Sequence, residues 1–410
     1  MNAYDNPQAA QTVLENAKAA GLDPDRIIDQ LKRLHIETPS WAYAEGGTRF
    51  GVFRQAGSAK TIEHKLADAA AVHCYTGITP TIAVHVLWDF PDGFDPALIE
   101  KAKKLGIQIG AVNPNVFQDQ AYKYGSLANP KPEVRKKAID HVRDSIKIAT
   151  QTRSKFLSIW LADGTNYPGQ DDIAQRRARL IDSLKEIYQA MPNDQVLLLE
   201  YKPFEPAFYQ TDIADWGMSM TLCRKLGDRA KVLVDIGHHY QAQNIEQIVT
   251  WLIEEDMLGG FHFNDRRYAD DDLTTASIDP YQVFRIFNEI VAAQQVRSRK
   301  FELAYMVDQS HNLKPKLEAM LQTVDTIHQL YAKALLVNRK ALAKAQADQD
   351  IIAAEEILRD AWLTDTRPLV GLVRQQTGRA PDAIAAYRKS GYQQQVEKER
   401  ANIKGGDTLG

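Results

Sequence analysis

The sequence predicts a closed (β/α)8 barrel, a TIM barrel, with N-terminal helices and a long C-terminal helical extension. Eight short apolar runs, each bounded by polar turns, alternate along the chain with helical segments. Runs of this kind are typical of strands buried on both faces, as in a parallel sheet. Because the alternation continues without a large antiparallel block, it favours a closed barrel over an open doubly wound sheet.

Each predicted strand has a definite place along the chain. The strands are expected at residues 36–44, 81–89, 107–113, 156–162, 196–201, 231–236, 259–264 and 300–307. With 410 residues, the chain has room for one barrel of about 250 residues together with extensions.

The helices between the strands carry start and stop signals. Asp95-Pro96 and Asp279-Pro280 each place an N-cap acid before a proline at the first helical position. Gly106 and Gly227 stand where a glycine should end the preceding helix. The helix that begins near Pro132 has apolar residues at intervals of three to four, which predicts one buried face: Val134, Ala138, Val142, Ile146 and Ala149.

Two extensions flank the predicted barrel, which we place at residues 36–334. Residues 1–35 are expected to form one or two helices, and residues 335–410 a helical arm rich in Ala, Lys and Glu. An arm with an apolar stripe and no obvious core of its own usually packs on a neighbouring subunit or back on the barrel. We therefore expect the arm to contribute an oligomer contact.

Composition and charge exclude several classes of protein. Lys and Arg (50) nearly balance Asp and Glu (53), so the net charge of −3 gives no field for nucleic acid or an anionic membrane. No apolar run approaches the roughly 20 residues that span a bilayer, and the N-terminus lacks the regions of a signal peptide. Cys74 and Cys223 are far apart, so we expect two buried thiols in a reducing cytosol rather than a disulfide. No glycine-rich phosphate motif follows a strand. The sequence predicts a cytoplasmic protein without nucleic-acid or membrane partners.

Acids and histidines follow four successive predicted strands. The carboxyl ends of barrel strands build the active site in (β/α)8 enzymes, and carboxylates with a minority of imidazoles suit Mn²⁺, Mg²⁺ or Co²⁺. One such residue is more often a helix cap or a satisfied polar group, but recurrence on four strands makes coincidence a poor explanation. The candidate ligands are Glu200, Asp235, His238, His262, Asp270, Asp272 and Asp308. They exceed what one ion needs, which predicts two adjacent ions.

Other polar and aromatic residues stand at the same strand ends. Lys202 faces the same side as the acid two residues before it; it is either a counter-charge or a cationic donor aimed at a substrate oxygen. His85, Trp41, Trp88 and Trp160 are either ordinary barrel plugs or hydrophobic platforms for a sugar face.

Long motifs carry a family resemblance over essentially the whole chain. They are TPSWA with GGTRFG, HVLWD, IWLADGTNYPGQ, EYKPFEP, VDIGHH, GFHFNDRRYADDDLTTASIDP and MVDQSHN. In these the chain resembles the L-rhamnose isomerase family of the broad-specificity bacterial type, related to the xylose isomerases. The resemblance implies a barrel with two divalent ions per subunit, usually Mn²⁺, that interconverts aldoses and ketoses, usually as a tetramer.

The resemblance also implies a division of the ligands between the two ions. Asp235 would bridge the ions. The first ion would take Glu200, Asp235, His262 and Asp308, and the second His238, Asp270 and Asp272.

The implied reaction is a hydride shift between C1 and C2 of an open-chain sugar. The first ion would fix two substrate oxygens. The second ion would activate a water that moves a proton between O1 and O2, and Asp270 is counted as catalytic because it would bind this second ion. Lys202 would polarise the carbonyl, and His85 would bind the ring oxygen. Because one methyl or hydroxyl discriminates only modestly in an apolar pocket, L-mannose, L-lyxose and D-allose stay candidates beside L-rhamnose.

Aromatic residues would close the implied pocket. Trp41, Trp88 and Trp160 would supply a dry wall for the hydride step. Phe50 would close the pocket of a neighbouring subunit.

Three other functions compete with this interpretation. A ketose 3-epimerase of the same superfamily uses one ion with a final Glu ligand. Asp308 in that last position, the second metal site and Lys202 all argue against this function. A barrel endonuclease acting on abasic DNA would need more histidines and a basic rim. A non-catalytic sugar-binding barrel would not need a second metal site.

Overall fold

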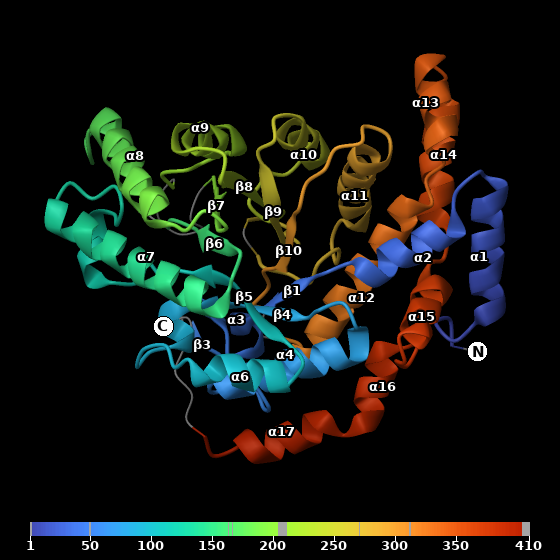
Figure 1. The fold of residues 1–410 in the computed structure, drawn as a ribbon, viewed down its shortest axis with the longest axis horizontal. Helices are drawn as coiled ribbons and strands as arrows, with labels where there is room; N and C mark the ends of the chain where they lie inside the picture. The colour runs from blue at the N-terminus through green and yellow to red at the C-terminus, as the bar shows by residue number, and fades with distance from the viewer. Residues whose placement is uncertain are drawn as a thin grey trace.

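The computed structural model confirms the predicted closed barrel of eight parallel strands (Figure 1). Each strand pairs in parallel with the next, and β1 closes the ring by pairing with both β10 and β4. The strands are β1 Glu37–Pro39, β4 Thr81–His85, β5 Gln108–Asn113, β6 Phe156–Ile159, β7 Val196–Glu200, β8 Ala230–Asp235, β9 Leu258–Phe263 and β10 Ala304–Val307. The structure describes residues 2–48, 51–162, 164–165, 167–203, 211–269, 271–310 and 313–403.

Four predicted strands, 36–44, 81–89, 156–162 and 300–307, are shorter than expected. β1 stops at Pro39 and is followed by a single helical turn, α3 (Ser40–Tyr43). β4 stops at His85 and is followed by the turn α5 (Val86–Asp89). Asp89 explains the turn after β4, because its Oδ2 accepts a hydrogen bond from the His85 N–H at 2.7 Å. This contact lies beyond the reach of strand periodicity. A small antiparallel pair, β2 Gly47–Thr48 and β3 Gly51–Val52, follows β1 outside the barrel.

Helices surround the strands, and the predicted boundary signals are largely confirmed. Asp279 caps α11 (Pro280–Gln295) by accepting from the Gln282 N–H at 2.9 Å. Gly106 (φ +82°) and Gly227 (φ +136°) follow the ends of α6 (Ala97–Lys104) and α9 (Trp216–Leu226). Asp95 accepts from the Ala97 N–H at 2.9 Å, but α6 begins at Ala97, so Pro96 is its N-cap and not its first residue as predicted. The helices are α3 Ser40–Tyr43, α4 Ile62–Thr76, α5 Val86–Asp89, α6 Ala97–Lys104, η1 Gln120–Tyr124, α7 Pro132–Thr152, α8 Ile173–Ala190, α9 Trp216–Leu226, α10 Ile245–Glu254, α11 Pro280–Gln295 and α12 Lys316–Leu335.

The predicted buried face of α7 and the predicted burial of the two cysteines can be compared directly with the structure. The face of α7 is confirmed, with Ala138, Val142, Ile146 and Ala149 buried and Val134 packed at its edge. The prediction of two buried thiols is wrong in part.

Cys223 is buried, whereas Cys74 is exposed. Cys74 lies on the outward face of α4, two residues beyond the buried Val72.

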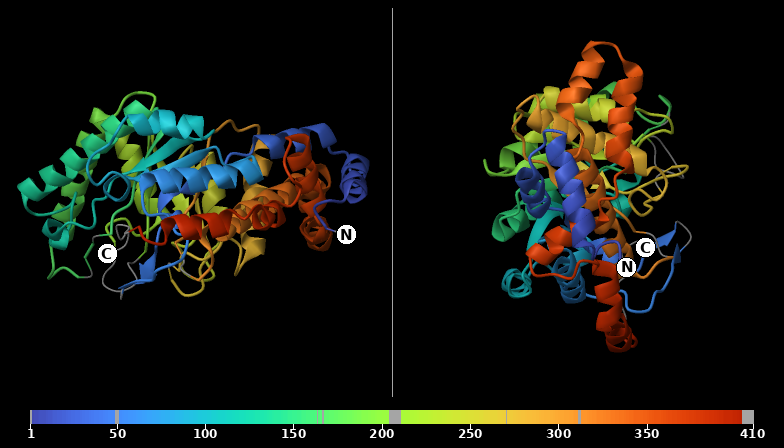
Figure 2. Two further views of the ribbon diagram at one scale, coloured as in Figure 1. Left: turned by 90° about the horizontal axis from the view of Figure 1, so that it is seen from below. Right: turned by 90° about the vertical axis from the view of Figure 1, so that its right-hand side faces the viewer.

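The chain ends form additional helices beside the barrel (Figures 1 and 2). They are α1 Pro7–Ala19, α2 Pro24–Arg33, α13 Arg339–Ala347, α14 Ile351–Leu363, α15 Arg367–Gln376, α16 Ala383–Ser390 and α17 Tyr392–Arg400. α1 packs on α15, while α13 and α14 form a pair that extends away from the barrel. The division of the chain at residues 35 and 335 stays a prediction. Among the described helices, none is both long and apolar enough to cross a membrane.

Candidate metal centre

Four side chains from four successive strands converge at one rim of the barrel. Glu200 and Asp235 end β7 and β8, His262 lies in β9, and Asp308 directly follows β10. One ligand atom of each lies within 4.8 Å of those of the other three. The parallel register pairs Asp235 with His262 across β8 and β9, so the strand ends bring the ligands to one level. This group is the set that the family resemblance assigns to the first ion.

The imidazole of His262 stands between carboxylates. Its Nδ1 lies 3.3 Å from Glu200 Oε1, 3.5 Å from Asp308 Oδ2 and 3.7 Å from Asp235 Oδ2. This buried nitrogen nevertheless forms no hydrogen bond of good geometry with the residues that the structure describes. A nitrogen lone pair and three carboxylates around one point fit a hard divalent cation such as Mn²⁺, Co²⁺ or Mg²⁺.

The charges of this cluster depend on one another. Burial lowers the pKa of His262, but Glu200, Asp308 and Asp235 outweigh it and raise that pKa above its usual value. Burial raises the pKa of Glu200, but His262 and His238 outweigh it and hold the pKa below its usual range. The cluster therefore balances its acids with a positive charge, a role that a bound cation also fulfils.

Neighbouring groups orient two of the acids. The Gly237 N–H donates to Asp235 Oδ1 at 2.7 Å, and the Asn264 side-chain amide donates to both Asp235 oxygens at 3.0 Å. A Cβ at Gly237 would lie 2.7 Å from the Asn264 amide oxygen, which explains the glycine. On the opposite side, Trp41 Nε1 donates to Asp308 Oδ1 at 2.8 Å. Such contacts fix the direction from which a carboxylate meets its metal.

The predicted ligands of the second ion are only partly described. His238 Nδ1 lies 3.0 Å from the Tyr201 carbonyl oxygen, which can only accept, so Nε2 is the ring atom suited to a metal. That Nε2 lies 4.0 Å from Asp235 Oδ2. Asp272 accepts a hydrogen bond from Ser310 Oγ at 3.2 Å, and Asp270 lies outside the described residues. The second ion therefore stays a prediction.

Lys202 is buried beside the cluster, two residues after Glu200. Its Nζ lies 4.9 Å from the centre of the Trp160 ring, which is a cation–π distance. The backbone of Lys202 is held by two hydrogen bonds. The Lys202 N–H donates to the Ile213 carbonyl at 2.9 Å, and Thr211 Oγ1 donates to the Lys202 carbonyl.

Aromatic rings form a continuous group at the same rim. The His85 ring centre lies 4.7 Å from Trp41 and 4.2 Å from Trp88. Phe117, which the sequence analysis missed, lies 5.8 Å from Trp88 and 4.9 Å from Trp160. The three predicted tryptophans are thus brought together through His85 and Phe117, while Phe50 lies outside the described residues.

His85 is a neutral imidazole in this aromatic group. Burial, with help from the charge of His262, lowers the pKa of His85 to about 3. Its buried Nδ1 has no hydrogen-bond partner of good geometry among the described residues. From behind, Asp89 holds the His85 backbone, and the buried Lys65 pairs with Asp89 at 2.6 Å.

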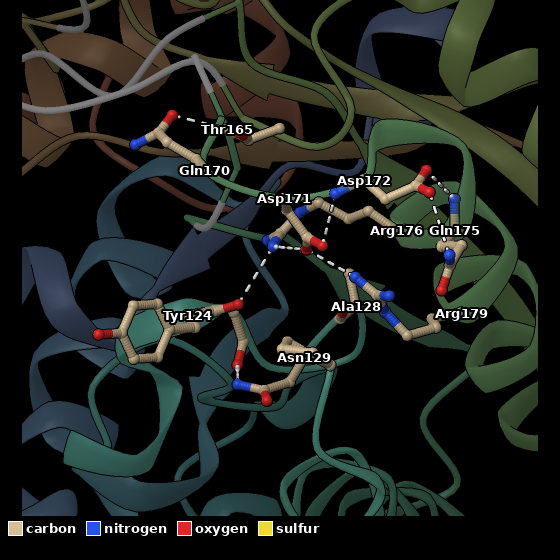
Figure 3. A network of polar contacts seen from close by, with 12 residues as sticks. Tyr124, Ala128, Asn129, Thr165, Gln170, Asp171, Asp172, Gln175, Arg176 and Arg179 are labelled. Carbon is tan, nitrogen blue, oxygen red and sulfur yellow. Dashed lines mark hydrogen bonds and ion pairs between the residues drawn. The ribbon is translucent and has the colours of Figure 1, made fainter. Parts of the chain in front are cut away.

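A buried arginine ties together the loops at this rim (Figure 3). Arg176 donates to both Asp212 oxygens at 2.6 and 2.8 Å, and also contacts Asp171 and the Tyr124 carbonyl. Figure 3 shows Arg179 donating to Asp171 and to the Ala128 carbonyl as well. These partners come from the loops after β5, β6 and β7, so the network holds three rim loops in place.

Comparisons with known proteins agree with this architecture. Residues 75–290 match the family described as xylose isomerase-like TIM barrel. A probable sugar isomerase of Rhizobium meliloti (strain 1021) is 40% identical over 391 residues, covering 94% of this chain and 91% of the relative. One of Mesorhizobium japonicum is 40% identical over 397 residues, covering 96% and 92%. The solved structure of an L-ribulose 3-epimerase has a TM-score of 0.52 at 12% identity, covering 77% of this chain and 97% of that one, and shows the fold alone.

Proposed function

The chain belongs to the xylose isomerase-like TIM barrel family, and from this premise we propose that it is an L-rhamnose isomerase. It would interconvert L-rhamnose and L-rhamnulose, and other aldoses such as L-mannose, L-lyxose and D-allose. The name of its relatives, probable sugar isomerase, supports the class of reaction. The observation that carries the proposal is the convergence of Glu200, Asp235, His262 and Asp308 at the carboxyl end of the barrel.

The cluster would hold the first of two divalent ions, with Mn²⁺ the first choice and Co²⁺ or Mg²⁺ the alternatives. When bound, such ions supply an electrophilic centre for adjacent sugar oxygens. His238, Asp270 and Asp272 would hold the second ion, with Asp235 shared.

Lys202 and the aromatic rings would act on the substrate directly. In the conversion of aldose to ketose, hydrogen leaves C2 with its electron pair and forms a new bond to C1, while the O2 proton passes to O1. Negative charge develops on O1 during this shift, and the Lys202 ammonium group is the cation that would stabilise it. Trp41, Trp88 and Trp160 would keep water from the migrating hydrogen. His85 would donate from Nδ1 to the ring oxygen of the closed sugar before it opens.

We also propose a homotetramer in which the arm from residue 335 onward contributes contacts. Ile351 and Ile352 on α14 are 69% and 75% exposed in the single chain. Large apolar side chains exposed side by side support a contact with another subunit at this place. Light scattering coupled to size exclusion measures the mass of the assembly. Phe50 would then close the pocket of a neighbouring subunit.

A substrate assay tests the proposed reaction. The Mn²⁺-loaded protein is incubated separately with L-rhamnose, D-psicose and D-fructose, and the products are separated by chromatography. Formation of L-rhamnulose without any C3 epimer is expected. Interconversion of D-psicose and D-fructose without L-rhamnulose would favour the ketose 3-epimerase instead. Repeating the panel with Co²⁺ and Mg²⁺ identifies the metal that supports the highest kcat/KM.

A further inference from the structure

A cavity lies at the end of the barrel opposite the metal cluster. Its volume is about 510 Å³, within the range of small-molecule sites. It is bounded by the first residues of several strands, Glu37 of β1 and Thr81 of β4 among them, and by the ends of α2 and α7. The residues that line it are distinct from those of the metal cluster and the aromatic group.

The cavity exists because the barrel interior is built from small residues at this level. Gly110, Ala111 and Ala304 line it, where large branched residues usually fill a (β/α)8 barrel. The short side chains leave room at this end of the barrel, opposite the strand ends that carry the metal ligands.

A carboxylic acid has been placed in this space. Glu37 is only 7% exposed, and its Oε1 accepts a hydrogen bond from the Ala111 N–H at 2.9 Å. A Cβ at Gly110 would lie 1.5 Å from Glu37 Oε2, so the glycine is what admits the carboxyl group. Burying a carboxyl group destabilises a fold unless the group has partners, and the proposed reaction does not use this one.

Two other polar groups around the cavity have no partner among the described residues. The Gln294 Oε1 atom is buried without a hydrogen-bond partner in this part of the chain, and it can accept from a ligand hydroxyl. The Arg153 guanidinium pairs with no group in the described part of the chain, and Arg153 has φ +58°, ψ +32°, a conformation that favours glycine. The negative end of the α7 dipole favours a cation there, but it explains neither Gln294 nor Glu37.

We propose that this cavity binds a small polyhydroxylated anion, the chemistry shared by sugar phosphates and sugar acids. Arg153 would bind the anionic group, and Arg33 and Lys155 at the same cavity add positive charge, although they also pair with Asp29 and Glu302. Gln294 would accept from a ligand hydroxyl group, and Glu37 would bind a second one deeper in the barrel.

Calorimetric titration of the Mn²⁺-loaded full chain, equilibrated beforehand with L-rhamnose, tests the site by a readout other than activity. The probes are D-fructose 6-phosphate, D-gluconate, D-fructose and inorganic phosphate, each in the presence of saturating L-rhamnose to occupy the metal centre. One site per chain is expected, with a sugar anion binding at least about tenfold more tightly than D-fructose or phosphate alone. The first two probes separate a phosphate from a carboxylate as the anionic group.

Matched variants locate the binding. Arg153→Gly suits the observed backbone conformation and should fold normally, yet weaken binding of the tighter sugar anion by about tenfold or more; Gln294→Ala should also weaken it. Arg143→Ala, which removes a half-buried arginine of α7 that pairs with Asp140 and Glu186 away from the cavity, should leave binding unchanged. Absence of saturable binding, equal affinity for phosphate alone, or unchanged binding by Arg153→Gly would overturn the proposal.

Discussion

Replacing Trp41 with phenylalanine separates two roles that the structure gives to one side chain. The indole ring belongs to the aromatic group, 4.7 Å from His85, while its N–H donates to Asp308 Oδ1 at 2.8 Å. Phenylalanine keeps an aromatic ring in the wall and removes only the donor. The Asp308 carboxylate then loses the group that directs its Oδ2 toward the other ligands.

The expected size of the effect follows from this bond. A hydrogen bond to a charged group contributes about 1.5–3 kcal/mol, and loss of an outer partner of a metal ligand weakens binding by about 10–100-fold. The Asp308 side chain is 21% exposed, so water can replace part of the lost contact. We therefore expect Mn²⁺ affinity to fall by about tenfold, the lower end of that range. Trp41 also packs inside the barrel on Ala83 and Met306, so the smaller ring should lower unfolding stability by about 1–3 kcal/mol.

Calorimetric titration with Mn²⁺ measures the first effect, and thermal unfolding of the metal-free protein measures the second. Trp88→Phe is the matched control, because the Trp88 indole N–H donates at 2.6 Å to Gln118 Oε1 rather than to a metal ligand. It should alter KM for the sugar while leaving Mn²⁺ affinity within about twofold. Equal Mn²⁺ affinity of Trp41→Phe and the unmodified protein would refute a positioning role for the indole. Absence of Mn²⁺ binding in the unmodified protein would instead refute the metal centre.

Four other changes have distinct expected outcomes. Lys202→Met should retain metal and lower kcat by about 100-fold or more; near-normal turnover would remove the proposed charge stabilisation. Asp270→Asn should halve the metal content per subunit by weakening the second ion, and loss of both ions would contradict the division of ligands. Burial raises the pKa of Glu37, so its stabilising contribution is present below the unfolded-state pKa and is lost as pH rises through the folded-state pKa. The free energy of unfolding in urea, measured at pH 5 and at pH 8, should therefore fall less between these pH values for Glu37→Gln than for the unmodified protein. An equal fall in both proteins would contradict this. Arg176→Met should lower the free energy of unfolding by about 3–5 kcal/mol, because it breaks a largely buried ion pair and removes two hydrogen bonds that the Asp212 carboxylate accepts; a change below about 1 kcal/mol would show the network to be dispensable.

The barrel was predictable because its strands are buried on both faces. Each strand is therefore a short apolar run, and all eight are found where the sequence places them. The ends of β1 and β4 were not predictable in this way. Ser40 and the His85 backbone both donate to Asp89 Oδ2, at 2.6 and 2.7 Å. This tertiary contact starts a helical turn in a segment whose local pattern still resembles a strand.

The candidate site was predictable to the extent that ligands stand at strand ends. Acids and histidines there are conspicuous, since such positions meet at one rim of any parallel barrel. Asn264 is two residues beyond His262 and shares its side of the strand, a signal that could have identified it. Phe117 and Arg176 lie farther along loops or on a helix. Their contacts depend on how separate loops pack, which periodicity does not report.

Asp235 lies between two histidines that the family resemblance assigns to different ions. Oδ1 accepts from both the Gly237 N–H and the Asn264 amide, so the carboxylate cannot rotate without breaking two hydrogen bonds. Oδ2 also accepts from the Asn264 amide, and it lies 3.7 Å from His262 Nδ1 and 4.0 Å from His238 Nε2. These histidines belong to different predicted ions. Because the fixed oxygen lies next to both, an ion at the His262 side keeps its Asp235 ligand even when the His238 side is weakened, which is why removal of the Asp270 charge should cost only one of the two ions.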